Sequence, residues 1–121
     1  MNERDKIVLE HVIRYCDEIY DANDQFGNSL DVLKANSVYK NAVSMCILQI
    51  GELVILLSDE LKIQYDEMPW RDIKGMRNIV AHQYHKFDFD TLWETIREDI
   101  PKLRKYCDYI IKINYTPEQL S

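Results

Sequence analysis

The residues best suited to chemistry lie between Pro69 and Asp88, in the segment PWRDIKGMRNIVAHQYHKFD, which holds Arg77, Asn78, His82 and Tyr84. A histidine can act as acid or base near neutral pH. The planar guanidinium of an arginine suits a phosphate oxygen or a developing negative charge, and an asparagine can orient the imidazole or bond a phosphate oxygen. These side-chain types suffice for metal-free cleavage of RNA, in which the 2′-OH is the nucleophile.

On one continuous helix these four residues can share a rim. Asn78 and His82 are four residues apart and are therefore neighbours on one face. Arg77 and Tyr84 are seven residues apart, which returns to nearly the same line after two turns. Arg77 and His82 differ by about 140° around the axis, a gap that a flexible arginine can bridge. We therefore expect the four side chains to converge on one site.

The charge of the chain is unevenly distributed. The 121 residues carry a formal charge of −6, which by itself argues against a nucleic-acid-binding protein. Between Trp70 and Phe87, however, four cations and one anion give +3, so the remainder carries −9. This segment is compatible with an RNA substrate, and its candidate phosphate-binding residues are Lys74, His85 and Lys86.

Other interpretations of these residues are open. A basic run on a helix is often only a solvated face, and a histidine near a helix C-terminus can complement the helix dipole. His82, His85 and Asp88 could hold a metal ion, but without a second cluster they are a weak metal signature, and we expect none. Glu52 either lies at a subunit interface or pairs with Arg77.

Helical periodicity dominates the elements that must position these residues, which predicts an all-α bundle. The first helix is expected from about Arg4 to Tyr20, followed by the polar loop DANDQFGNS. Leu30 and Leu33 predict a short leading turn of helix. Ser37 is the expected N-cap of the long helix that follows.

The long helix combines two adjacent apolar faces, which predicts contact with more than one neighbour, either another helix or another subunit. Gly51 within it costs about 1 kcal/mol relative to alanine, and we expect the close approach of another backbone or a bulky side chain in return. One face comprises Val38, Ala42, Met45, Gln49, Glu52 and Leu53, and the other Ile50, Val54 and Leu57.

Two further helices are expected. Pro69 suits the first turn of a third helix, which extends at least to His82 and has core positions at Trp70, Ile73, Met76 and Val80. Thr91 and Glu94 form a capping-box pattern at the start of the last helical segment. Pro101 inside that segment should kink or divide it.

The composition, 46% hydrophobic and 30% charged, is typical of a soluble globular protein. No apolar run approaches the roughly 18 residues of a membrane span, and the charged start MNERDKIVLE does not resemble a secretory signal. Cys16, Cys46 and Cys107 lie far apart, so we expect buried thiols rather than disulfides or a zinc site. We expect one domain over residues 1–121, located in the cytoplasm.

The segment Arg77 to Tyr84 resembles the R-x4-H-x-Y signature of HepT-like proteins in the HEPN superfamily. R-x4-H alone is a weak motif, but the resemblance extends over about residues 4 to 113 in order and spacing. It includes Ile50-Gly51-Glu52, Pro69-Trp70-Arg71, Gly75-Met76-Arg77-Asn78 and Leu92-Trp93-Glu94-Thr95 through Asp99-Ile100-Pro101.

This resemblance implies an up-and-down HEPN bundle of four to five helices that forms a homodimer, with the two motifs facing a shared cleft. It also implies a metal-independent endoribonuclease without a cofactor, acting as the toxin of a type II toxin–antitoxin system. By the same analogy Arg77 stabilises the phosphate, His82 is the acid–base residue and Asn78 supports them.

The implied partner is an MNT-type nucleotidyltransferase antitoxin that transfers AMP to Tyr84, and the ATP and Mg²⁺ belong to that enzyme. An adenylylated Tyr84 would place bulk and negative charge where the RNA phosphate must bind. The alternative is a non-catalytic dimeric module that binds nucleotide or docks the nucleotidyltransferase, because the acidic remainder of the chain would repel long RNA. Residues 21–40 carry little of the family pattern.

Overall fold

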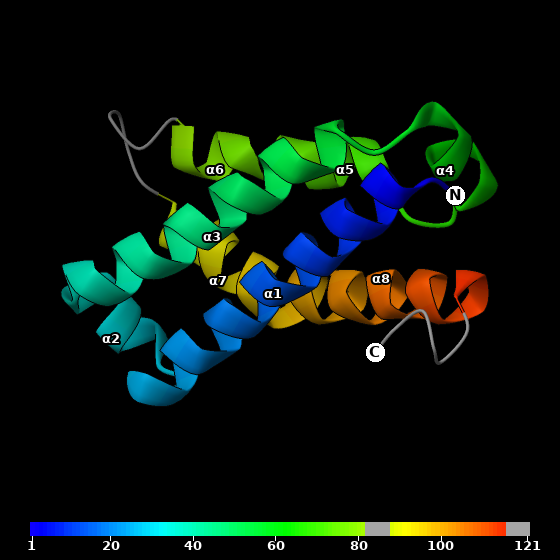
Figure 1. Cartoon of the computed structure of the whole chain (residues 1–121). Coiled ribbons are helices and arrows are strands. Elements are labelled where there is room, and N and C mark those ends of the chain that lie inside the picture. The colour runs from blue at the N-terminus through cyan, green and yellow to red at the C-terminus, as the bar shows by residue number, and fades with distance from the viewer. Residues whose placement is uncertain (82–87, 116–121) are drawn as a thin grey trace.

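The computed structural model describes residues 1–81 and 88–115, and all of the regular structure in them is helical. Four rods run alternately up and down (Figure 1): α1 (Glu3–Gln25), α3 (Ser37–Ile55), the pair α5 (Trp70–Gly75) and α6 (Arg77–Ala81), and a C-terminal rod. The C-terminal rod comprises α7 (Phe89–Glu94), a π-helical turn (Thr95–Asp99) and α8 (Ile100–Asn114). Two short helices lie in the connections along the chain: α2 (Leu30–Ala35) between α1 and α3, and α4 (Asp59–Gln64) between α3 and α5. The predicted all-α bundle is confirmed.

Helix α1 lies against both α3 and α8 and supplies one wall of the core. Its buried side chains recur every three or four residues, as the sequence predicts for an amphipathic helix. The apolar side chains of α1 that are fully buried are Leu9, Val12, Cys16 and Ile19.

The predicted end of α1 near Tyr20 is wrong, because the helix continues to Gln25. The residues DANDQ favour a turn by composition, but Asn23 is buried and accepts a hydrogen bond of 2.5 Å from the Tyr39 hydroxyl. The chain then reverses at Gly27, whose φ of +81° is readily adopted by glycine. A contact from a distant helix therefore extends α1 by more than one turn.

Helix α3 is capped one residue earlier than predicted. The side chain of Asn36, rather than that of Ser37, accepts hydrogen bonds from the backbone N–H groups of Val38 (2.9 Å) and Tyr39 (3.1 Å). The short helix expected around Leu30 and Leu33 is confirmed as α2, with Leu33 fully buried.

The C-terminal rod also begins earlier than the predicted Thr91–Glu94 capping box. Asp88 is the N-cap of α7, and its carboxylate accepts from the Thr91 backbone N–H (3.0 Å) and hydroxyl (2.6 Å). The rod is divided at Pro101 as predicted, since the π-helical turn ends immediately before α8. Proline has no N–H to donate to the preceding turn, which is consistent with this change of helical geometry.

Helix α3 contacts α1, α2, α5 and α6, which confirms more than one neighbour. Its buried face contains Tyr39, Val43, Ile47, Ile50 and Val54. Of the other face predicted from the sequence, Leu53 is half-buried, but Val38 (66%) and Met45 (53%) are strongly exposed. An apolar stripe therefore runs along the outside of this helix.

The sequence has no apolar run of about 18 residues, but by length and composition alone α3 could cross a membrane. Helix α3 has 19 residues, and its most apolar 18-residue window has a mean hydropathy of 1.3 and is 44% buried inside the bundle. A core helix of a globular protein meets the same criteria, and the contacts of α3 with four other helices are of that kind. The apolar character of α3 therefore needs no membrane to explain it.

Candidate functional site

The third predicted helix consists of two helices, α5 and α6, with a tight turn at Met76 between them. The Met76 N–H donates to the Ile73 carbonyl oxygen at 3.0 Å, an i→i−3 bond of the 3₁₀ type. Both helices pack against α3, and the predicted core positions Trp70, Ile73 and Met76 are buried. His82, to which the helix was expected to extend, lies outside the described residues.

Gly51 explains how α3 meets this junction. A Cβ atom added to Gly51 would lie 3.1 Å from the Cβ of Arg77 and 3.2 Å from the carbonyl oxygen of Lys74. The close approach of another backbone, predicted from a glycine inside an apolar helix, is therefore confirmed. The absence of a side chain on α3 lets the start of α6 lie directly against it.

Arg77 and Glu52 form an ion pair across this contact. The Arg77 Nη1 atom lies 2.8 Å from the Glu52 Oε1 atom, and the two side chains are 41% and 50% exposed. Of the two roles left open for Glu52, pairing with Arg77 is confirmed. An ion pair this exposed adds little stability, but it directs the guanidinium to the edge of α3. A substrate phosphate would compete with Glu52 for the same donors.

The other predicted site residues divide into two groups. Lys74 on α5 and Asn78 on α6 are exposed, and Asn78 directly follows Arg77. The convergence of the full motif therefore stays a prediction, because the remaining candidates lie outside the described residues: His82, Tyr84, His85 and Lys86.

A metal centre finds no support in the part of the chain that the structure describes. No group of three or more His, Cys, Asp or Glu side chains is arranged there to hold an ion. The alternative site of His82, His85 and Asp88 falls mostly outside these residues.

The cysteines are packing residues, as predicted. Cys16, Cys46 and Cys107 are buried and form no disulfide. Burial raises the pKa of Cys16 and of Cys46 to about 12, and the carboxylate of Glu18 acts in the same direction on Cys46. Burial also raises the pKa of Cys107. These thiols are protonated at neutral pH and are unsuited to be nucleophiles.

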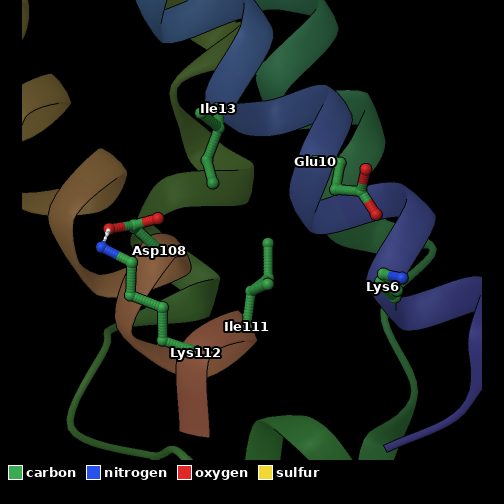
Figure 2. Close-up of a pocket in the computed structure, with 6 residues that line it drawn as sticks. All are labelled: Lys6, Glu10, Ile13, Asp108, Ile111 and Lys112. Atoms are coloured by element: carbon green, nitrogen blue, oxygen red, sulfur yellow. Dashed lines mark ion pairs between the residues drawn. The ribbon is translucent and has the colours of Figure 1, made fainter. Parts of the chain in front are cut away.

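A hollow of about 350 Å³ between α1 and α8 offers a second place for a ligand (Figure 2). The side chains of Ile13 and Ile111 lie between its charged groups, which are Lys6, Glu10, Asp108 and Lys112. Lys112 is already bound to Asp108, with Nζ 2.8 Å from Oδ2. Two lysines balance two acids, so this hollow has no preference for an anion. The α5–α6 junction is the better candidate site.

Known proteins that are similar to this chain are described as ribonucleases. The sequence profile described as "Ribonuclease HepT-like" matches residues 9–110. The chain is 32% identical over 115 residues to "Putative RNase MJ1216" of Methanocaldococcus jannaschii, covering 93% of this chain and 92% of that protein. It is 38% identical over 55 residues to "Probable ribonuclease HepT" of Thermococcus cleftensis, covering 46% of this chain and 50% of that protein. No solved structure matches significantly.

Proposed function

Because the chain belongs to the HepT-like ribonuclease family, we propose that it is a metal-independent endoribonuclease and the toxin of a toxin–antitoxin pair. The observation that carries the proposal is the position of Arg77, which lies in the basic segment of the sequence. Its Nη1 atom is 2.8 Å from the Oε1 atom of Glu52, and this ion pair holds the guanidinium at the edge of α3. His82, five residues further along the chain, supplies the acid–base group.

The reaction needs few groups. A base removes the proton of the 2′-OH, the oxygen attacks the adjacent phosphorus, and the bond to the 5′-oxygen breaks as that oxygen is protonated. Arg77 stabilises the charge that develops on the phosphate oxygens, and Asn78 orients the phosphate or the imidazole. One imidazole cannot be base and acid in the same step, so His82 from each of two copies facing one cleft would provide both.

The homodimer in this proposal is supported by the exposed stripe on α3. Val38, Met45 and Ile55 are 66%, 53% and 38% exposed, and Glu52 lies on the same side of the helix. Apolar stripes of this kind are commonly covered by a partner, and a second copy presents a matching stripe across a two-fold axis. Because Glu52 binds Arg77, a copy seated on this stripe brings the two motifs close together.

The oligomeric state tests that arrangement. We expect the parent chain to sediment as a dimer and Met45→Glu to sediment as a folded monomer with little ribonuclease activity, since a buried unpaired charge opposes association. Ile113→Glu is the matched control, because Ile113 is 55% exposed on α8, away from the stripe, and should stay dimeric. A dimeric Met45→Glu protein would exclude this interface.

The catalytic role is tested by comparing two ion-paired arginines. Arg77 binds Glu52 on the candidate site, whereas Arg104 on α8 binds Asp17 on α1 at 2.6 Å. We expect Arg77→Ala and His82→Ala to lose cleavage by about 100-fold or more while remaining folded, and Arg104→Ala to cleave as the parent does. Parental cleavage by Arg77→Ala and His82→Ala would refute the catalytic assignment.

Neutralisation is proposed to occur by AMP transfer to Tyr84 from an MNT-type nucleotidyltransferase, which uses its own ATP and Mg²⁺. The added phosphate would repel the substrate phosphate near Arg77. Incubation of the two proteins should add the mass of one AMP to the parent and none to Tyr84→Phe. Modification at another residue would remove this account. A parent that binds the enzyme tightly but never cleaves RNA would instead favour the non-catalytic docking module.

A further inference from the structure

A second surface near Arg77 gathers cations from two helices. A hollow of about 180 Å³ between α3, α4 and α5 is lined by Val54, Lys62, Trp70, Arg71 and Lys74, and we call it the cationic groove. Among the described residues no carboxylate lines it, unlike the hollow in Figure 2, where two lysines face two acids. The sequence alone assigns no role to Lys62, because it lies on α4 outside the basic segment.

The single acid of α5 lies on another side of the helix. Asp72 lines a separate hollow of about 310 Å³ with Asp99 of the π-helical turn. The helix dipole accounts for Lys62 and Lys74, which lie in the last turns of α4 and α5. It does not account for Arg71, which lies in the first turn of α5, where the dipole disfavours a cation. The convergence of these charges therefore has another cause.

Among the described residues, Lys62, Arg71 and Lys74 have no carboxylate partner. Arg77, Arg104 and Lys112 each bind a carboxylate within 2.8 Å. Within residues 1–81 and 88–115, the cationic residues of the groove make no such ion pair. Like charges gathered without counter-charge repel one another, and a bound anion would relieve that repulsion.

The groove leads to the candidate site. Arg71, Lys74 and Arg77 recur every three residues, so they follow one side of the α5–α6 rod. The 3₁₀ turn at Met76 has three residues per turn and keeps Arg77 in this line. Six residues of helix span about 9 Å along the axis. This length exceeds the reach of one phosphate group but suits consecutive phosphates of a strand.

We propose that the cationic groove binds backbone phosphates of the RNA strand that enters the cleavage site at Arg77. This inference rests on the proposed ribonuclease function and names an additional substrate-binding surface. Trp70 is only 7% exposed, and its Nε1–H donates to the Tyr65 carbonyl oxygen at 3.0 Å, so its ring offers no face for a base. The groove therefore holds the strand through its phosphates, independently of base sequence.

Binding of a fluorescent 2′-O-methyl RNA of about twelve nucleotides, measured by anisotropy, tests the proposal. We expect the triple variant Lys62→Gln, Arg71→Gln, Lys74→Gln to raise the Kd by about ten-fold or more. The slope of log Kd against log salt should fall by about 2, because each lost contact with a single strand removes about 0.7. The matched control replaces three exposed cations elsewhere, Arg4, Arg14 and Lys34, by glutamine and should keep the parental Kd.

The outcomes separate this proposal from the function on which it rests. The 2′-O-methyl RNA lacks the nucleophile, so its binding requires no catalysis. A higher Kd for the RNA in the groove triple, with a parental Kd in the control triple, supports phosphate binding by the cationic groove. This holds even if the parent never cleaves RNA. Unchanged Kd and salt slope in that triple overturn it, as does an equal loss in the control triple. If the groove triple loses affinity for an acidic protein partner but not for the RNA, the assignment of the groove to RNA is overturned as well.

Discussion

The pair α1 and α8 and the edge formed by α4, α5 and α6 are built on different principles. In the pair, Arg104 and Lys112 of α8 bind Asp17 and Asp108, and the apolar faces are fully buried. At the edge, the cations of the groove lack ion pairs within the described residues. The ion pairs of the first region join residues within the bundle and support the fold, whereas the cations of the groove in the second region are available for a ligand.

The lengths of the helices follow the same division. α1 has 23 residues and α8 has 15, whereas α5 has six and α6 has five. Helices of five or six residues are not stable alone, so α5 and α6 depend on their contact with α3. Substitutions in the pair should therefore change stability, and those at the edge should change function.

The largest expected effect is on the free energy of unfolding. Leu9→Ala, at a fully buried position of α1, should cost about 2–5 kcal/mol because it leaves a cavity against neighbouring helices. Ile7→Ala, two residues away and 52% exposed, should change stability by about 0.5 kcal/mol or less. Urea unfolding followed by circular dichroism measures both. Equal losses would mean that the inner face of α1 does not carry the stability.

A smaller effect is expected where the two regions are joined. Asp5 of α1 is fully buried, and its carboxylate accepts from the Ser58 backbone N–H (2.8 Å) and hydroxyl (2.6 Å) at the start of α4. Asp5→Ala removes both acceptors and should cost about 1–3 kcal/mol. Because α4 carries Lys62, this variant should also weaken RNA binding.

The control for that prediction is Asp59→Ala, an exposed acid in the first turn of α4. It should cost about 0.5 kcal/mol, through the helix dipole alone. Asp5→Asn keeps one acceptor, so its loss in the free energy of unfolding should lie between those of Asp5→Ala and Asp59→Ala. Asp5→Ala with the stability of Asp59→Ala would show that these buried hydrogen bonds do not join α1 to α4.

Features encoded within a few residues were predictable from the sequence. The buried positions of α1 follow from a local 3.6-residue period, and Gly51 signalled a close contact because glycine is unfavourable inside a helix. The cap positions were wrong by one residue at α3 and by three at α7, since Asn36 and Asp88 compete with nearby Ser37 and Thr91 for the same role.

Features that depend on distant residues were less predictable. The last turns of α1 are stabilised by the hydrogen bond between Asn23 and Tyr39, 16 residues apart. The sequence pattern of α3 contains two apolar faces but does not show which of them points inward. In the structure, Val38 and Met45 lie on the outside. At the site, sequence named both roles of Glu52, but only the contact with Arg77, 25 residues away, decides between them.

The smallest expected effects come from two glycines at the edge, and they test whether α3 positions Arg77. Gly75→Ala meets open space and should stabilise α5 by about 0.5–1 kcal/mol with parental cleavage. Gly51→Ala gains similar helix propensity but places its Cβ 3.1 Å from the Arg77 Cβ, so the junction must shift by a few tenths of an ångström. The net change in stability should be within about 1 kcal/mol.

Cleavage should nevertheless fall several-fold in Gly51→Ala, because catalysis is more sensitive than stability to small displacements of an arginine. Rates measured at equal folded fractions, together with urea unfolding, distinguish the two effects. If both glycine variants cleave equally, then α3 supports the edge without positioning it. If only Gly51→Ala loses activity, the long helix α3 also sets the position of Arg77, through its close contact with the start of α6.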